Sequence, residues 1–362
     1  MIPNDPTTLG NDIPALCERL VKHQAELEQP SAWPEGQLQW LSDADVLRWT
    51  VPAEFGGRAI SRSELAFGYE TLGAACLTTT FVLTQRNAAI ARIGLSDNES
   101  LKEELLNSLC TAATFATVGI SHLTTSRQHL APAVTAHEID GGFVLDGQIP
   151  WVTGGRCADH IVTGATLSDG RQVLLVIEGG QSGVDADEPS QLMALNATNT
   201  GTISLTNVSV PRHRVLSGPI EGVMMQGRSG GPGSLTTSAL ALGHTAGAIN
   251  RLNLEAERRP ELSETFEPLV AELTTVRTDM YAGIEGTREG ESVSAESVRQ
   301  RSNSLVLRAT QACLAASKGA GFSKGHPAER AVREAMFFLV WSCPQPVLQA
   351  NLREFARGCG LG

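Results

Sequence analysis

The spacing of hydrophobic positions changes twice along this chain of 362 residues. From residue 9 to about 111, apolar side chains recur every three or four positions, as in helices with one buried face, with breaks at Pro30, Pro34 and Gly56. Between about 112 and 225 the period becomes two, in short β-branched runs separated by turn residues. Beyond a glycine-rich segment at 226–234 the helical period returns.

This order predicts an α+β protein with three domains: an N-terminal all-α domain at 1–111, a middle β-barrel or sandwich at 112–225, and a C-terminal four-helix bundle at 226–362. In the last part, helices are expected at about 235–258, 263–286, 294–318 and 327–341, with one more from about 346.

One segment of the middle region brings an aromatic ring and a hydroxyl close together in the chain: Trp151-Val-Thr153-Gly-Gly155. A hairpin is expected ahead of it, because Phe143, Leu145 and Ile149 alternate with polar neighbours and Asp146-Gly147 is a strong turn signal. A tryptophan buried in a β domain, beside a threonine suited to a strand, is one interpretation. A functional site that uses both side chains is the other.

Composition narrows the class of protein. The hydrophobic content of 41% and charged content of 19% are typical of a soluble globular chain, and the net charge of −11 argues against a nucleic-acid groove. Seven scattered cysteines without Cys-x-x-Cys spacing indicate a reduced compartment, and no apolar run approaches the ~20 residues of a membrane span. We expect a cytoplasmic protein. The eight histidines show no metal-ligand spacing, so no metal site is predicted.

The segment at 151–155 resembles the Trp-Ile-Thr-Asn-Gly signature of the acyl-CoA dehydrogenase superfamily. Further segments resemble the family in step along nearly the whole chain: 51–57, 208–216 and 320–335. The resemblance implies the family's fold and a bound FAD. It implies that Trp151 covers the isoalloxazine ring, that the Thr153 hydroxyl bonds the flavin near N5, and that Ser121 offers a hydroxyl to the pyrimidine edge.

The resemblance also implies contacts across subunits. Arg258 or Arg259 would bind the FAD pyrophosphate of a partner subunit, with Arg259 as the named candidate, and the glycine turn at Gly319 would pack on that FAD. Guanidinium suits phosphate, although a solvated charge at a helix end is the alternative. The family's glutamine ahead of this turn is Ala315 here, and its first glycine is Lys318. A homodimer or homotetramer is expected, with a hetero-oligomer as an alternative.

The chain departs from the family where the catalytic base is expected. Members that carry a glutamate at this register read Tyr-Glu-Gly-Thr, whereas this chain reads Trp341-Ser342-Cys343-Pro344. A serine does not act as a general base without an activator, and Cys343 is more typical of a small buried side chain. The family's other location for the glutamate, at about 233–238, also lacks a carboxylate.

The segment expected at the entrance of the ligand pocket also differs from the family's pattern. Ser126 and Arg127 lie where the family contacts the CoA part of its substrate, so the resemblance implies that they bind an acyl-CoA or similar ligand. A lone surface arginine is the alternative for Arg127. His122 lies beside this lip, where a packing role is more typical than catalysis.

Three functions follow from these observations. The first is an FAD-dependent oxidoreductase that acts on an acyl thioester or a similar ligand without the usual glutamate. The second is a flavin-dependent monooxygenase of the same fold, which receives reduced flavin from outside. The third is a non-catalytic subunit that assembles with a sibling chain.

Overall fold

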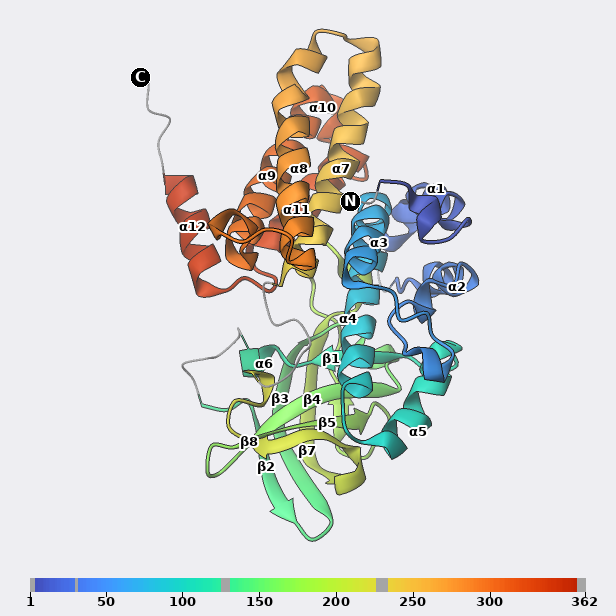
Figure 1. The fold of residues 1–362 in the computed structure, drawn as a ribbon, viewed down its shortest axis with the longest axis vertical. Helices are drawn as coiled ribbons and strands as arrows, with labels where there is room; N and C mark the ends of the chain where they lie inside the picture. The colour runs from blue at the N-terminus through green and yellow to red at the C-terminus, as the bar shows by residue number, and fades with distance from the viewer. Residues whose placement is uncertain (1–3, 30–31, 125–130, 226–233, 357–362) are drawn as a thin grey trace.

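A computed structural model describes residues 4–29, 32–124, 131–225 and 234–356. Figure 1 shows a layer of strands at one end, the C-terminal helices at the other, and N-terminal helices alongside. The N-terminal helices are α1 (Ile13–His23), α2 (Glu35–Asp43), α3 (Arg62–Ala75), α4 (Leu77–Gly94) and α5 (Glu99–Cys110). The C-terminal helices are α7 (Leu235–Arg258), α8 (Leu262–Glu285), α9 (Ala295–Ala316), α10 (Lys318–Gly321), α11 (Pro327–Ala335) and α12 (Gln345–Ala356).

Between these two groups lie the short helix α6 (Ser121–Thr124) and one sheet. Its strands are β1 (Ala116–Gly119), β2 (Val134–Ile139), β3 (Gly142–Val152), β4 (His160–Leu167), β5 (Gln172–Glu178), β6 (Val184–Ala186), β7 (Gly201–Pro211) and β8 (Val215–Ile220). The order of helices, sheet and helices confirms the expected α+β fold. The domain boundaries after residues 111 and 225 stay a prediction. In the described ranges, every helix is too short or too polar to cross a membrane.

The sheet has the strand order β6-β7-β3-β2-β4-β5-β8, and β1 pairs with β4 outside this path. Two strands share one edge of β4. β1 pairs in parallel with the first half of β4, up to Thr163, whereas β2 pairs in parallel with Thr166 and Leu167. The other pairs of neighbours are antiparallel. β1 therefore ends in the middle of the layer, and the chain leaves it there into α6.

The hairpin of β2 and β3 turns at Gly141, which has a φ of 81°, and not at Asp146-Gly147. The prediction of a turn at that dipeptide was wrong. Asp146 and Gly147 lie inside β3, where the register with β7 shifts after Leu145. A Cβ at Gly147 would lie 2.1 Å from the carbonyl oxygen of Ala133. Gly147 thus forms part of a β-bulge that packs tightly against the neighbouring backbone. Glycine is favoured both in bulges and in turns, so the dipeptide does not distinguish the two.

The sheet is buried on two sides. Phe143, Leu145 and Ile149 are each fully buried in a core between the strands, which confirms their predicted alternation. In β5, Leu174 and Val176 point the other way and join the core formed with α4 and α5. Burial on both faces explains why β5 is continuously apolar.

The N-terminal and C-terminal helices share one hydrophobic core. Phe67 and Leu72 of α3 belong to the same cluster as Leu240 of α7. The two helices cross closely because α7 carries glycines at the contact. A Cβ at Gly243 would lie 2.3 Å from the carbonyl oxygen of Glu70. The middle region is therefore inserted between two sets of helices that fold against each other.

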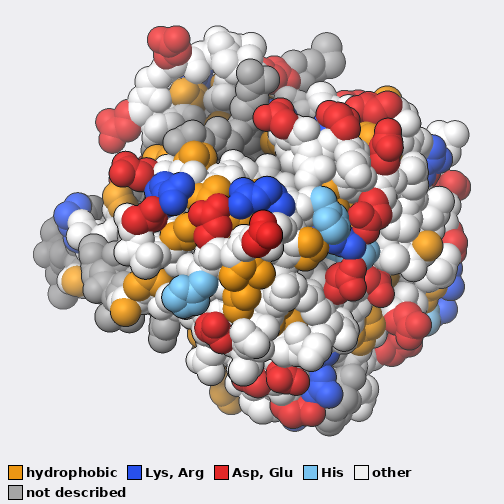
Figure 2. All heavy atoms as spheres, turned by 90° about the horizontal axis from the view of Figure 1, so that it is seen from below, with side chains coloured by type: hydrophobic (Ala, Val, Ile, Leu, Met, Phe, Trp, Pro, Cys, Tyr) orange, Lys and Arg blue, Asp and Glu red, His pale blue; other side chains and the backbone are white. Residues whose placement is uncertain are grey.

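The surface of the sheet end carries charges of both signs. Figure 2 shows this end of the molecule, where acidic and basic side chains are interspersed with apolar ones. Arg214 lies 2.7 Å from both Glu104 and Glu178, and Arg212 lies 2.7 Å from Glu138. These arginines are therefore balanced by neighbouring carboxylates.

Candidate functional site

The turn at residues 151–155 begins at a second bulge in β3. The register between β3 and β7 shifts between Ile149 and Val152, so that β3 has one residue more than β7. Trp151 lies in this bulge with a φ of 59°, a left-handed conformation that costs a bulky residue roughly 1–3 kcal/mol. It is 58% exposed, whereas Val152 is 1% exposed. The bulge therefore turns a large indole out of the sheet and towards solvent.

The hydroxyl of Thr153 belongs to a buried network. Its Oγ1 lies 3.0 Å from Oγ1 of Thr200, which in turn lies 2.8 Å from Oγ1 of Thr198. Thr117 donates its hydroxyl to the carbonyl oxygen of Thr153 at 2.7 Å. Thr153 is only 2% exposed, so its hydroxyl and the indole of Trp151 differ in their access to solvent. A hydroxyl has one donor and two acceptor positions, so this network leaves Thr153 capacity for a further bond.

Helix α6 brings Ser121 to the same turn. Ser121 donates its hydroxyl to the carbonyl oxygen of Pro150 at 3.1 Å, immediately before Trp151. His122 beside it has its Nε2 2.9 Å from the carbonyl oxygen of Gly164, which is a packing contact. The structure thus places Trp151 and Ser121 together. Ser126 and Arg127 lie outside the described residues.

Ser342 follows the 3₁₀ turn η10 (Met336–Leu339) and has a left-handed φ of 46°. The residue before it is held by a side chain that sequence reasoning missed. Arg299 of α9 donates Nη2 to the carbonyl oxygen of Trp341 at 2.8 Å and Nη1 to that of Thr237 in α7 at 3.2 Å. Its guanidinium carbon lies 5.3 Å from the centre of the Trp341 ring. Arg299 therefore connects the segments at 234–238 and 341–344, the two registers at which the family carries its glutamate.

Arg299 is a fully buried cation. Burial lowers the pKa of its guanidinium to about 10, so it stays protonated at neutral pH, and the titratable group that faces it is Cys343. No carboxylate of the described segments pairs with it, and its Nε has no acceptor there. Burial raises the pKa of the Cys343 thiol, an effect that Arg299 opposes without cancelling. At the register where the family carries its glutamate, the electrostatic environment is therefore positive, and the Cys343 thiol is protonated at neutral pH.

Arg259 and the glycine turn also lie together, at the other end of the helices. Arg259 follows the last residue of α7 and donates Nη2 to Glu255 at 2.7 Å and to the carbonyl oxygen of Ala316. Ala316 ends α9, and Gly319 follows in α10. At 1.5 Å per residue, Arg259 is roughly 30 Å along α7 from Thr237. Figure 1 shows α10 at the end of the bundle away from the sheet. The candidate residues thus form two separate groups in one chain.

Comparison with known proteins shows which family this chain resembles. The family model described as "Acyl-CoA dehydrogenase, N-terminal domain" matches residues 13–113. The probable acyl-CoA dehydrogenase YngJ of Bacillus subtilis is 19% identical over 340 residues, which cover 88% of each chain. Butyryl-CoA dehydrogenase from Megasphaera elsdenii has the same fold, with a TM-score of 0.82 and 18% identity over 99% of this chain and 100% of its own. The N-terminal part of the chain therefore matches a family model of the acyl-CoA dehydrogenases, and the chain as a whole has the fold of that superfamily.

The same fold is found in a solved structure with different bound ligands. TdsC from Paenibacillus sp. A11-2, in complex with FMN and indole, has a TM-score of 0.81 and 16% identity, with 96% of each chain covered. Because their sequence identities to this chain are 18% and 16%, butyryl-CoA dehydrogenase and TdsC show the fold of this chain and no more.

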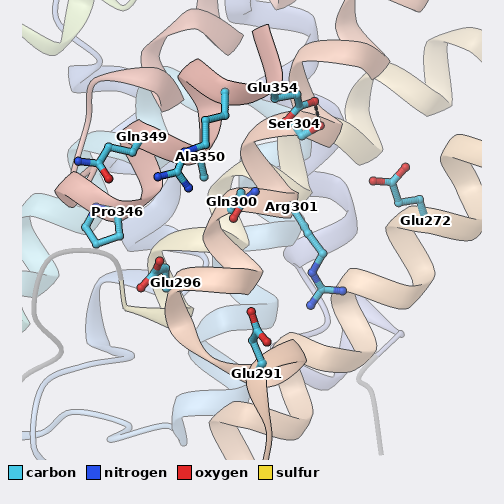
Figure 3. A pocket seen from close by; sticks show the side chains of 11 residues that line it. Glu272, Glu291, Glu296, Gln300, Arg301, Ser304, Pro346, Gln349, Ala350 and Glu354 are labelled. Carbon is cyan, nitrogen blue, oxygen red and sulfur yellow. Dashed lines mark hydrogen bonds between the residues drawn. The ribbon is translucent and has the colours of Figure 1, made fainter. Parts of the chain in front are cut away.

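None of the predicted site residues lines a cavity of about 610 Å³ that the described part of the chain encloses. It is bordered by α8, α9, α12 and the 3₁₀ turn η9 (Glu291–Val293). Figure 3 shows carboxylates and arginines around it. Arg301 at its wall pairs with Asp279 at 2.7 Å, and Glu354 accepts a hydrogen bond from Ser304. Its lining is polar and already paired in part, and it offers neither the indole nor the hydroxyls of the turn at 151–155.

The sequence contains one indication that Arg299 is buried. In α9, Val298, Arg299, Ser302 and Leu305 follow at helical spacing and are all buried, so the arginine interrupts the apolar face. A charged residue on such a face requires partners inside the protein. The spacing could have indicated a buried arginine, but not that its partners would be the carbonyls of residues 237 and 341.

Proposed function

We propose that this chain is a flavoprotein oxidoreductase that holds FAD and acts on an acyl thioester or a similar ligand without a carboxylate at residue 342. The observation that carries the proposal is the indole of Trp151, held out of the sheet at a strained bulge beside Ser121. The names of YngJ and of butyryl-CoA dehydrogenase support acyl-CoA as the class of substrate.

The residues around the turn at 151–155 fit a flavin. An exposed indole offers a flat apolar face for a tricyclic ring, and the hydroxyls of Ser121 and Thr153 suit its polar edge. Arg259 and Gly319 suit the diphosphate and adenine end, but lie roughly 30 Å along α7 from the Thr237 end. This separation supports a homo-oligomer in which they serve the FAD of a neighbouring subunit.

FAD, when bound, supplies a two-electron acceptor. The protein's part would be to position it: Trp151 would cover one face, and the hydroxyls of Ser121 and Thr153, which bond Pro150 and Thr200 in the protein, would hold the polar edge. Arg299 fixes the turn at residues 341–343 through the carbonyl of Trp341, and its charge favours negative charge on a ligand bound there. Ser126 and Arg127 are proposed to bind the distal part of the ligand.

Flavin binding tests this proposal. We expect the purified protein to bind FAD, and Trp151→Ala to weaken FAD binding by about tenfold because the stacked indole is lost. Phe355→Ala is the control, because Phe355 is a similarly exposed aromatic residue of α12, at 55%. The binding constants are measured by fluorescence titration of FAD. A wild-type protein that binds no FAD, or two variants that bind it equally well, would contradict the proposal.

A flavin-dependent oxygenase is a second candidate, favoured by the positive environment of residue 342. Such a reaction does not require removal of an α-proton, so the absence of a carboxylate at residue 342 would not slow it. The complex of TdsC with FMN and indole adds support for this class. Oxygen consumption with reduced FMN supports the oxygenase, whereas bleaching of bound FAD by butyryl-CoA supports the dehydrogenase.

A further inference from the structure

A second cavity, of about 270 Å³, lies between α2, the segment 112–115 and the 3₁₀ turn η5 (Gly155–Cys157). This volume corresponds to about nine molecules of liquid water. Arg86 of α4 lines it and is 1% exposed, whereas Glu35 and Asp159 line it and are exposed. The cavity therefore has a cation at its floor and carboxylates at its mouth.

Arg86 is held by backbone groups. Its Nη1 donates to the carbonyl oxygen of Leu47 at 2.8 Å and to Oδ1 of Asn87 at 3.4 Å, and its Nη2 donates to the carbonyl oxygen of Leu109. Leu109 lies in the last turn of α5, whose carbonyls carry partial negative charge. A guanidinium has five N–H donors. Two of them have no acceptor among the residues that the structure describes.

The charge of Arg86 is not neutralised within the described part of the chain. Burial lowers the pKa of Arg86 to about 10, so it is protonated at neutral pH. The titratable groups that face it are Cys110 and Tyr69, and neither is a carboxylate. Asp159 is instead engaged at the mouth, where its carboxylate accepts the backbone N–H of Phe115 at 2.7 Å. A buried guanidinium with unused donors is a strong recognition element for an anion.

Part of the wall of this cavity is apolar. Trp33 and Phe115 pack edge to face with their ring centres 5.6 Å apart, and Leu38 and Leu47 lie in the lining with them. The polar side chains of Gln39, Ser42 and Thr114 also form part of the wall. A dianion such as phosphate would be repelled by Glu35 at the mouth, and it has no apolar group that could contact the aromatic rings. We propose that the cavity binds a small monocarboxylate with an apolar body, such as benzoate, with its carboxylate on Arg86.

This site lies behind the turn at 151–155. A Cβ at Gly154 would lie 2.6 Å from the ring of Trp33 and 3.2 Å from that of Phe115. A bound carboxylate would thus share two walls with the backbone that presents Trp151. Its binding requires no flavin, so its test is independent of the proposed function.

Calorimetric titration of the full chain with sodium benzoate tests the proposal. We expect saturable binding of benzoate, and none of benzamide or inorganic phosphate. Arg86→Met should weaken benzoate binding by more than about tenfold, because a charged hydrogen bond is lost. Arg92→Met is the matched control, since Arg92 is a second largely buried arginine of α4 that does not line the cavity.

Two further variants keep the test decisive if Arg86→Met does not fold. Leu38→Trp fills the cavity and should abolish benzoate binding, and Glu35→Gln removes a repulsive charge and should strengthen it by a few fold. Absence of benzoate binding overturns the proposal. So does binding that Leu38→Trp leaves unchanged, or binding of phosphate in place of benzoate.

Discussion

Ser342 is the residue at which the proposed reaction can be tested most directly. Ser342→Glu would place a carboxylate close to Arg299, whose positive charge keeps that carboxylate ionised. We expect it to accelerate reduction of bound FAD by butyryl-CoA by roughly 10²-fold or more, the usual contribution of a positioned base. Stopped-flow absorbance measures the rate. Ser342→Gln, similar in shape but not basic, is the control, and equal rates for both variants would show that residue 342 does not face the substrate.

His244 and Glu334 form a buried pair whose pKa values predict opposite pH dependences. Nδ1 of His244 lies 3.8 Å from Oε2 of Glu334. Burial raises the pKa of Glu334 from 4.5 to about 7 and lowers that of His244 from 6.5 to about 4. The neutral acid stabilises the fold below pH 4.5, and this stability is lost as the pH rises to 7. The neutral imidazole stabilises it above pH 6.5, and this stability is lost as the pH falls to 4. Between pH 4.5 and 6.5 the two effects oppose each other.

Replacing one residue of this pair should reveal the pH dependence of stability that the other residue causes. For Glu334→Gln, the free energy of unfolding should rise with pH between 4.5 and 6.5 by up to about 1.4 kcal/mol per pH unit, relative to the wild type. For His244→Gln it should fall with pH over the same window by a similar amount. Urea unfolding at several pH values measures both slopes. Parallel curves for the two variants would show that the pair does not titrate in this way.

At the scale of elements, the crossing of α3 and α7 depends on the absence of a side chain at Gly243. The Cβ of an alanine would lie 2.3 Å from the carbonyl oxygen of Glu70, which is backbone and does not move alone. We expect Gly243→Ala to lower the free energy of unfolding by roughly 1–3 kcal/mol, because the helices must separate. Gly180→Ala is the control, since nothing lies within 4 Å of its Cβ. Thermal denaturation compares the two; an unchanged midpoint for Gly243→Ala would refute the close crossing.

At the scale of the whole molecule, Arg333 connects three parts of the chain. From α11 it donates Nη2 to Glu28 of the 3₁₀ turn η2 (Gln24–Glu28) at 2.6 Å and Nη1 to the carbonyl oxygen of Met193, between β6 and β7, at 3.2 Å. It also bonds Glu329 within its own helix. One guanidinium thus fastens the C-terminal helices to the N-terminal part and to the sheet.

Replacing Arg333 should therefore cost more than replacing an arginine in a local surface pair. We expect Arg333→Met to lower the free energy of unfolding by roughly 1–3 kcal/mol, because Glu28 loses a charged partner. Arg308→Met removes a two-pronged pair with Glu272 that is more exposed, and should cost less than about 1 kcal/mol. Chemical denaturation of both variants gives the comparison. Equal losses would mean that the connection contributes no more than a surface pair.

The helices were readable from the sequence because their signals are local. The segments expected at 235–258 and 327–341 correspond to α7 (Leu235–Arg258) and to α11 (Pro327–Ala335) followed by η10. Amphipathic spacing and glycine breaks act within a few residues, so no distant contact is needed to detect them. At the candidate site, the sequence singled out Trp151 and Ser121, and the structure bonds Ser121 to the carbonyl oxygen of Pro150, the residue before Trp151.

The features that the sequence did not predict arise from contacts between segments that are far apart in the chain. The bulge at Gly147 exists because β7 and the backbone of Ala133 press against β3, which a dipeptide alone does not report. The positive environment at Ser342 arises because α9 brings Arg299 to two carbonyls over 100 residues apart in sequence. Periodicity shows which face of a helix is buried, but only the fold shows what that face meets.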